Sequence, residues 1–191
     1  FASTLISYNQ NRIEKHPKST NEEKLMQGNV GLHLRSGVLY ADNNKTLLEP
    51  APFIVDGRTL IPVRAVSEAF GLGVNWDEKT STVTVDGTTE IIIDKSEMNV
   101  NGRTVALDVP AAIKDGRTFI PFRALCEDVL GKKVYYDDTV PYNSGMIIIS
   151  DKEFSAPENA NALQRLNDFL FYYRPTAKQV TEMYDKNGLK N

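Results

Sequence analysis

Hydrophobic and polar positions change in short runs between glycine-containing turns along the middle of the chain, a pattern that predicts strands. Thr82-Val-Thr-Val85 alternates strictly, whereas Met146-Ile-Ile-Ile149 is apolar throughout, and both runs have strand length. Asp56-Gly57, Asp115-Gly116 and Asn101-Gly102 predict two-residue hairpin turns, because glycine accepts the positive φ that such turns need and Asp and Asn tolerate it. We therefore expect hairpins to dominate this region.

Two stretches instead carry apolar residues at the three- to four-residue spacing of an amphipathic helix, near residues 62–70 and 121–130. The proline that opens each stretch suits the first helical position, where a missing N–H costs nothing. Gly71 and Gly131 follow at the points where a helix would stop. The pattern thus predicts one short helix in each half of the region.

A thirteen-residue segment occurs twice, 59 positions apart. Residues 56–68 and 115–127 are identical at nine positions, and the other four exchange apolar or small residues. A repeat of this period indicates a duplicated supersecondary unit, here a hairpin, a strand, a helix and a strand. The repeated structural positions are Asp56, Gly57, Arg58, Pro62, Asp115, Gly116, Arg117 and Pro121. We expect an α+β fold in which both copies form one twisted antiparallel sheet packed on two short helices.

These patterns divide the chain into three parts. Residues 1–28 form a polar flank that reads as a loop or a marginal helix. Residues 29–150 form the duplicated domain, with repeat 1 at about 29–88 and repeat 2 at about 89–150. Residues 151–191 form a helical tail or a linker to a further domain. The 191 residues therefore hold one domain with two flanks.

Composition narrows the possible function classes. The net charge is −3 and no Lys/Arg cluster alternates with aromatic residues, so nucleic acid is not an expected partner. No apolar run approaches the ~18 residues of a membrane span. Cys126 is the single cysteine, which excludes an internal disulfide, and we expect it to be a buried bystander. Because the chain begins with Phe1, we expect a processed product or an expressed fragment.

Arg64 and Arg123 are the first candidate binding residues. Both are expected in the first turn of a helix, where the macrodipole disfavours a cation, so a repeated partner is expected. Glu68 and Glu127 lie four residues on, within reach on the same helix face. The favoured interpretation is a structural ion pair or a bond to strand carbonyls. The alternative is contact with an anion or an acidic sugar. The same two interpretations, with the same preference, apply to Arg58 and Arg117.

Trp76, Tyr135 and Tyr136 are the second group of candidate binding residues. Flat aromatic side chains with a polar handle can stack on sugar rings. However, Trp76 and Tyr136 hold equivalent places at the start of a strand beneath a predicted helix. That position favours core packing for these residues, with sugar contact as the alternative.

Residues with catalytic or metal-binding chemistry are sparse. Asp77-Glu78 and Asp137-Asp138 are interpreted as solvated turn charges, since adjacent residues seldom converge on one ion. His33 is expected at the surface or half-buried, and no nucleophile motif is present. We therefore expect no catalytic residue, no metal, no cofactor and no enzyme activity.

The repeated Asp-Gly-Arg-Thr-(Leu/Phe)-Ile-Pro-(Val/Phe)-Arg-Ala, followed by Val-x-(Trp/Tyr)-Asp, resembles the copper amine oxidase-like N-terminal domain family over residues 30–150. Members occur as stalk domains on secreted and surface proteins of Gram-positive bacteria. The resemblance implies an appendage that carries neither copper nor a quinone cofactor. The sequence agrees, because His16 and His33 are the only histidines and a copper site built on imidazoles needs about three.

The tail is predicted to form a helix over 158–173 and a second one from a Thr176 cap to Asn187-Gly188. It resembles the stretch that leads into heparinase II/III-like polysaccharide lyase domains. Together, the two resemblances imply a non-catalytic extracellular or cell-surface module of a polysaccharide-degrading enzyme. The expected partners are a polysaccharide or another domain of the parent protein. The alternatives are a carbohydrate-binding module for cell-wall or acidic glycans, and an adhesion or oligomerisation module.

Overall fold

The computed structural model describes residues 20–139 and 145–173. Within these ranges the protein is built mainly from antiparallel sheets with a few short helices, which confirms the expected α+β class. The strands form two five-stranded sheets and one four-stranded sheet, so the expectation of a single sheet is wrong. None of the described helices is both long and apolar enough to cross a membrane.

The first five-stranded sheet joins the two ends of the domain, in the order β13-β14-β1-β2-β3. Its centre is the antiparallel pair β1–β14, in which Leu32 lies opposite Ile147. The strands are β1 (Val30–His33), β2 (Val38–Ala41), β3 (Asn44–Leu47), β13 (Lys133–Asp137) and β14 (Met146–Ser150). A hairpin from the second half of the domain therefore completes a sheet begun by the first half.

The second five-stranded sheet has the order β10-β9-β8-β7-β6 and follows the chain without interruption. Its strands are β6 (Val74–Asp77), β7 (Thr82–Val85), β8 (Thr89–Ile92), β9 (Glu97–Val100) and β10 (Arg103–Ala106). The last three of these begin 59 residues after β1, β2 and β3, respectively. In this sheet, strands of the second half of the domain continue a hairpin from the first half.

The four-stranded sheet, of order β11-β12-β5-β4, contains the repeated motif. Its strands are β4 (Phe53–Val55), β5 (Arg58–Pro62), β11 (Ala112–Lys114) and β12 (Arg117–Pro121). The Asp56-Gly57 and Asp115-Gly116 turns have positive φ at all four residues, which confirms the predicted hairpin turns. At the centre, Ile61 lies directly opposite Ile120 across the antiparallel pair β5–β12.

The helices after β5 and β12 differ from one another. Helix α3 (Val63–Ala69) is an ordinary α-helix. The sequence predicted Pro62 as its first helical residue, but Pro62 is its N-cap. The second helix, η1 (Ala124–Val129), is a π-helix rather than an α-helix, with Leu130 N donating to Leu125 O at 2.9 Å. A wider turn absorbs an added residue. This agrees with the sequence offset, which grows from 59 at the prolines to 60 at Val74 and Val134.

Helix α4 (Ala160–Phe171) forms the described part of the tail and packs on β1, β2 and β14. The Asn159 side chain accepts from Ala162 N at 2.8 Å and caps its first turn. Lys45 of β3 donates to the carbonyls of Phe169 and Tyr172, so a cation sits at the negative end of the helix dipole. The second predicted tail helix, after Thr176, lies outside the described residues.

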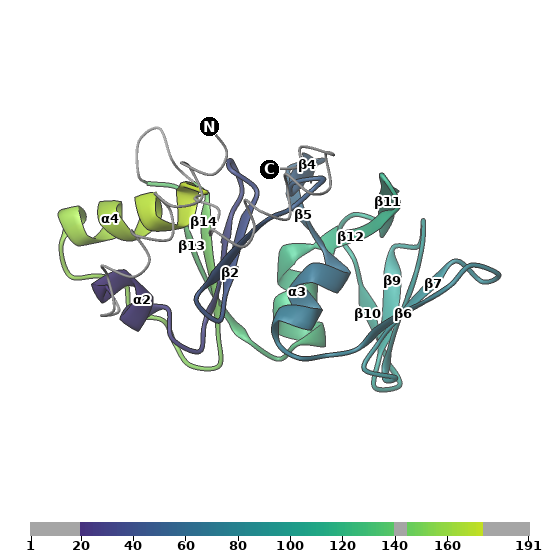
Figure 1. Ribbon diagram of the computed structural model, residues 1–191. Coiled ribbons are helices and arrows are strands. Elements are labelled where there is room, and N and C mark those ends of the chain that lie inside the picture. Colours follow the sequence, from purple (N-terminus) through teal and green to yellow (C-terminus); the bar gives the residue numbers. More distant parts are fainter. Residues whose placement is uncertain (1–19, 140–144, 174–191) are drawn as a thin grey trace, which may run out of the picture.

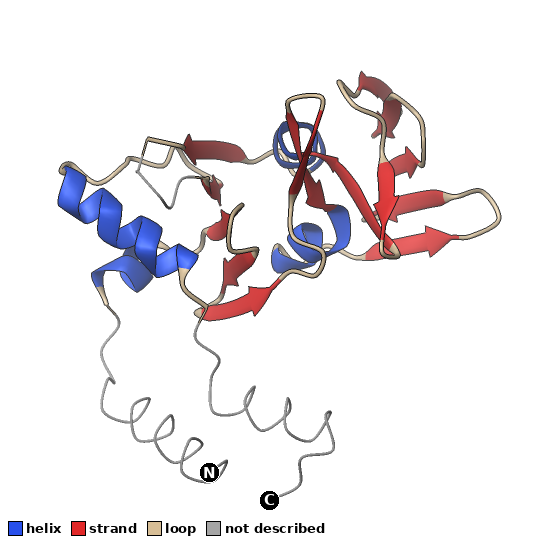
Figure 2. Cartoon of the chain, turned by 90° about the horizontal axis from the view of Figure 1, so that it is seen from above, coloured by secondary structure: helices blue, strands red, loops and turns tan. Residues whose placement is uncertain are grey.

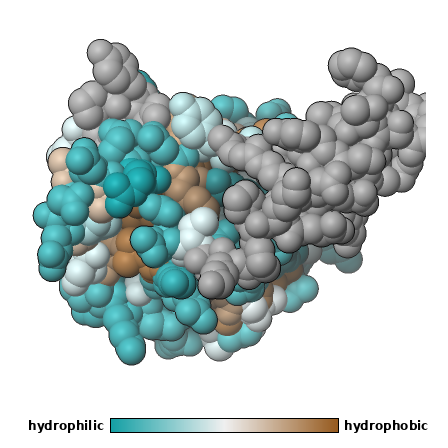
Figure 3. All heavy atoms as spheres, turned by 60° about the vertical axis from the view of Figure 1, so that its left-hand side comes forward, coloured by the Kyte–Doolittle hydropathy of each residue, from teal (hydrophilic) through white to brown (hydrophobic). Residues whose placement is uncertain are grey.

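The N-terminal flank contributes helix α2 (Asn21–Leu25), which lies against α4. Its N-terminus has a capping box, in which Thr20 and Glu23 each accept from the other's backbone N–H. Figure 2 shows α2 and α4 together at one end of the molecule. Seen from that end, the described surface is largely hydrophilic around a small hydrophobic area (Figure 3). The apolar stripe of α4 is thus turned mainly inward.

Helix α4 explains why one closing strand is apolar throughout and the other alternates. In β14 all five residues are buried, whereas in β7 every second residue is only half-buried. The outer face of the first sheet forms a cluster with the helices, made of Met26, Tyr40, Met146, Ile148, Leu166 and Leu170. Its inner face shares the main core with α3, η1 and the second sheet. In Figure 1 these layers follow one another from left to right.

Candidate functional site

Two cavities lie where a helix, a strand and a turn of the four-stranded sheet meet. The α3 cavity, of about 700 Å³, is lined by residues that include Glu49, Arg64, Glu68, Trp76 and Arg117. The η1 cavity, of about 580 Å³, is lined by residues that include Arg58, Asp108, Arg123, Asp128 and Tyr136. Both volumes are in the range of about 300–1,000 Å³ that small-molecule sites occupy.

The two linings correspond to one another in the sequence. Three charged residues recur after 59 positions: Glu49 corresponds to Asp108, Arg58 to Arg117, and Arg64 to Arg123. Each cavity takes its helix arginine from one half of the domain and its turn arginine from the other half, because β5 and β12 pair antiparallel. The two cavities are therefore built from corresponding residues. The differences between them indicate which cavity has an unpaired arginine side chain within the described residues.

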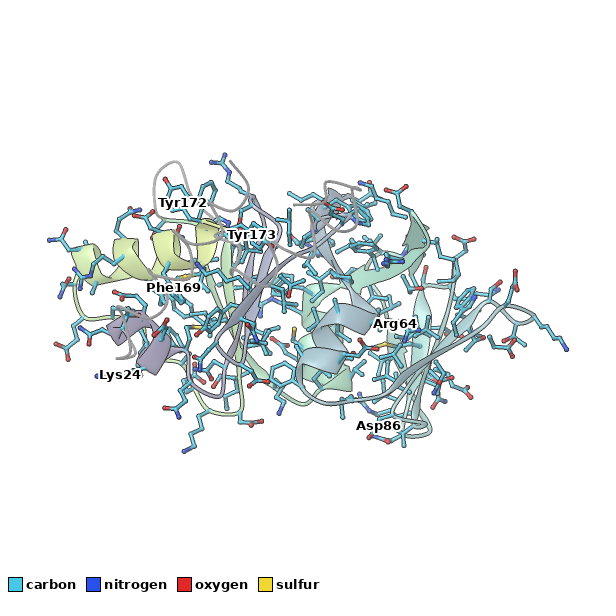
Figure 4. The ribbon with its side chains drawn as sticks, in the orientation of Figure 1. Lys24, Arg64, Asp86, Phe169, Tyr172 and Tyr173 are labelled. Atoms are coloured by element: carbon cyan, nitrogen blue, oxygen red, sulfur yellow. The ribbon has the colours of Figure 1, made fainter. Side chains whose placement is uncertain are left out.

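Both helix arginines pair with a glutamate four residues on, and Arg64 also bonds a strand carbonyl, which agrees with the favoured interpretation of Arg64 and Arg123. Arg64 Nη1 donates to Glu68 Oε1 at 3.2 Å and to the carbonyl of Val74 at 2.7 Å. Arg123 Nη1 donates to Glu127 Oε1 at 2.9 Å. Figure 4 shows Arg64 on α3, between the two five-stranded sheets. These arginines position the walls of the cavities, and their charge is already balanced.

Trp76 and Tyr136 are not core residues, and the prediction that they pack in the interior is wrong. Each is 41% exposed and lines its own cavity. The reason is their place on β6 and β13, which are edge strands of their sheets. In β6, Val74 is buried, whereas Trp76, the next residue on the same face of the strand, is exposed at the cavity. Both side chains are therefore accessible for contact with a sugar, which was the alternative interpretation.

Tyr135 has a different environment from the other two candidate aromatic residues. Its ring is half-buried and lies 5.3 Å from that of Phe154, at the cluster under α4. Burial, together with Asp137, raises the pKa of Tyr135 above its usual value. It lines neither cavity, so a shared site formed by Trp76, Tyr135 and Tyr136 does not occur.

The turn arginines distinguish the two cavities. Arg58 Nε donates to Asp108 Oδ2 at 2.7 Å, so the lining of the η1 cavity contains an ion pair. The Arg117 side chain is exposed and makes no ion pair or hydrogen bond with the residues that the structure describes, and the Glu49 side chain makes none with them either. Sequence reasoning placed Arg58 and Arg117 in the repeat motif without seeing that each meets the opposite half of the domain. Only the pairing of β5 with β12 reveals this.

Three other residues that the sequence analysis singled out, Cys126, His33 and Asp137, are all buried. Cys126 is fully buried as expected, and desolvation raises the pKa of its thiol to about 12. His33, expected at the surface or half-buried, is fully buried instead, with Nε2 3.3 Å from Asn167 Oδ1 and its ring against Phe171, because α4 covers β1. Asp137, expected to be solvated, is buried and accepts from Thr139.

The donor set does not fit a copper site. Within the described residues, no group of three or more His, Cys, Asp or Glu side chains gathers as ligands of a metal would. His33 is enclosed by Asn167 and Phe171, so its imidazole belongs to the packing of α4. The arrangement can instead hold a small ligand at a surface cavity through an arginine and an aromatic ring.

Comparison with known proteins agrees with these features. A search of curated proteins finds no match. The family model described as the copper amine oxidase N-terminal domain matches residues 40–141, which include both copies of the repeated motif and the lining residues of both cavities. That domain is a non-catalytic accessory domain of its enzyme. Because the match spans more than half of the chain, the protein belongs to the copper amine oxidase N-terminal domain family.

Proposed function

We propose that this chain is a non-catalytic accessory module of a larger secreted or cell-surface protein, in which it spaces, docks or orients a partner domain. The observation that carries the proposal is the structural use of the repeated charged residues. Arg64 pairs with Glu68 and Arg123 with Glu127, so the same residues hold the same helices twice. A catalytic centre needs one asymmetric set of groups, whereas these residues build two similar halves.

The proposal includes an internal duplication of about 59 residues. Its support is the equal offset of β1, β2 and β3 from β8, β9 and β10, and of β5 from β12. Under this proposal each closing hairpin has joined the sheet of the other copy. The interlocked halves would make a rigid unit, which suits a module that sets the position of a neighbouring domain.

The polysaccharide context and the extracellular location also belong to the proposal. They are supported by the resemblance of the tail to the stretch that precedes heparinase II/III-like lyase domains. The α4 helix packs on the first sheet, so the chain that follows would leave the module from a fixed point. The parent protein would then be a polysaccharide-degrading enzyme.

Activity and stability measurements on the purified chain test the accessory role. We expect no oxidation of amines and no cleavage of acidic polysaccharides. We also expect the same melting temperature with copper, without copper and with a chelator. Measurable turnover that follows the protein through purification, or a melting temperature that rises with copper, would contradict the role. Fusing the chain to a polysaccharide lyase and comparing cleavage of insoluble and soluble substrate tests docking directly.

A carbohydrate-binding function is the second candidate, favoured by the exposed Trp76 in the α3 cavity. An adhesion or oligomerisation function is the third. It is favoured by β4 and β11, which are edge strands that expose Ile54 and Ile113 and could add a strand from a partner. Light scattering over a concentration series separates them, because only the third predicts a mass that grows with concentration.

A further inference from the structure

The η1 cavity already contains a carboxylate, and this shows what its counterpart is able to bind. Asp108 Oδ2 lies 2.7 Å from Arg58 Nε, at the mouth formed by the turn of β4 and β5. Charge-assisted bonds between arginine and a carboxylate are among the stronger hydrogen bonds in proteins. The η1 cavity is therefore occupied at its anion position by the protein's own side chain.

The α3 cavity has the same position without the internal ligand. Arg117 lines it from the turn of β11 and β12, and its side chain makes no ion pair or hydrogen bond to the described residues. Glu49, the counterpart of Asp108, lines the same cavity and makes no ion pair with Arg117. A guanidinium at the mouth of a cavity of about 700 Å³ is thus available to an outside carboxylate.

We propose that the α3 cavity binds a uronate residue of an acidic polysaccharide, with Arg117 pairing the carboxylate and Trp76 stacking on the sugar ring. This inference rests on the proposed accessory function, since it assigns a ligand to a module that binds without turnover. The η1 cavity is the same site closed by Asp108.

The composition of the cavity favours a sugar acid over a more highly charged ligand. Trp76 is 41% exposed and combines an aromatic ring with an N–H at its edge, which matches a sugar ring that has an apolar face and hydroxyl groups. Glu49 and Glu68 line the cavity as well, so the two acidic side chains balance the charge of its two arginines. A cavity without net charge offers no added attraction to a phosphate-rich ligand, whereas a single carboxylate per residue finds one available guanidinium.

Titration calorimetry with trigalacturonate and with its methyl ester tests the inference. We expect one site per chain for the acid, and binding of the ester that is weaker by about tenfold or more, as loss of a charged hydrogen bond predicts. Arg117→Gln should weaken acid binding by a similar factor and leave ester binding unchanged. Trp76→Ala should weaken both ligands equally. Arg165→Gln, on α4 and outside both cavities, is the matched control and should change neither.

A second variant tests the closed site. Asp108→Ser removes the internal carboxylate, and the number of trigalacturonate sites should rise from one to two. The additional site should then disappear on Arg58→Gln. A melting curve of each variant shows that loss of binding is not loss of folding, because both residues of the pair are more than half exposed.

Several outcomes would overturn the inference. These are equal affinity for the acid and the ester, no effect of Arg117→Gln, a single site after Asp108→Ser, or no binding at millimolar trigalacturonate. Arg117-dependent binding of a glutamate-rich peptide in place of the sugar would overturn it in favour of a protein partner. Each of these leaves the accessory role standing, whereas cleavage of trigalacturonate by the chain would refute the accessory role itself.

Discussion

The packing of α4 on the first sheet can be tested by giving β14 the residue that its counterpart carries. Ile148 and Thr84 hold corresponding places, because each precedes the residue that pairs with the valine of the adjacent edge strand. Ile148 is fully buried in the cluster under α4, whereas Thr84 is half-buried on a face that no helix of the described residues covers. We predict that Ile148→Thr is strongly destabilising and that Thr84→Ile is nearly neutral.

The magnitude follows from the atoms exchanged. Ile148→Thr removes about two methyl-sized groups from the cluster at ~0.8 kcal/mol each and buries a hydroxyl at about 1–3 kcal/mol. The free energy of unfolding should fall by about 3–5 kcal/mol, which lowers Tm by roughly 6–20 °C for a chain of this length. Thr84→Ile should stay within about 0.5 kcal/mol of the wild type.

Urea denaturation followed by circular dichroism measures both changes, and a double-mutant cycle adds the partner. Leu170 of α4 belongs to the same cluster, so Leu170→Ala and Ile148→Thr should be non-additive by about 0.5–3 kcal/mol. If Ile148→Thr costs no more than Thr84→Ile, or if the two losses add, α4 does not cover β14 in solution. The packing of α4 on the first sheet would then be wrong.

The remaining predictions concern the repeat and the buried thiol. Gly57→Ala and Gly116→Ala should each cost about 1–2 kcal/mol in urea denaturation, because φ is +74° and +72° there, and unequal losses would argue against equivalent turns. Arg64→Gln should cost about 1 kcal/mol or less in the same assay, since the Arg64–Glu68 pair is half-exposed, and a much larger loss would contradict this. Burial raises the pKa of Cys126 from 9.0 to about 12, so the stability it contributes is present below pH 9 and is lost as the pH rises toward 12. Cys126→Ser should flatten that alkaline loss, and thiol reagents should modify the wild type only after unfolding.

Local features of the fold could be read from the sequence, because the residues that determine them are neighbours in the chain. Asp56-Gly57 and Asp115-Gly116 predicted turns with positive φ, and both form. Gly71 and Gly131 predicted helix ends, and both have positive φ one residue past the C-cap. Each of these predictions depends on backbone preferences of one or two residues.

Strand pairing could not be read in the same way. The run Met146–Ile149 predicted a strand, but its pairing with β1, more than 110 residues earlier, depends on contacts that no local pattern records. The prediction of one sheet failed for this reason. The burial of His33 failed as well, because it depends on α4, whose docking place was not predicted. An apolar run without alternation was the available sign that both faces of β14 are covered.

The difference between the two cavities could not be predicted from the sequence either. Arg58 and Arg117 look alike in sequence, since each follows an Asp-Gly turn in an identical tetrapeptide. The antiparallel pairing of β5 with β12, centred on Ile61 and Ile120, places each arginine in a cavity with a carboxylate of the other half, so the pairing treats the two arginines alike. The shorter Asp108 pairs with its arginine, while Glu49 does not. Under the proposed duplication, two initially equal sites have therefore diverged at the carboxylate and not at the arginine, so the anion-binding group remains in both halves and one acidic residue determines which site is open.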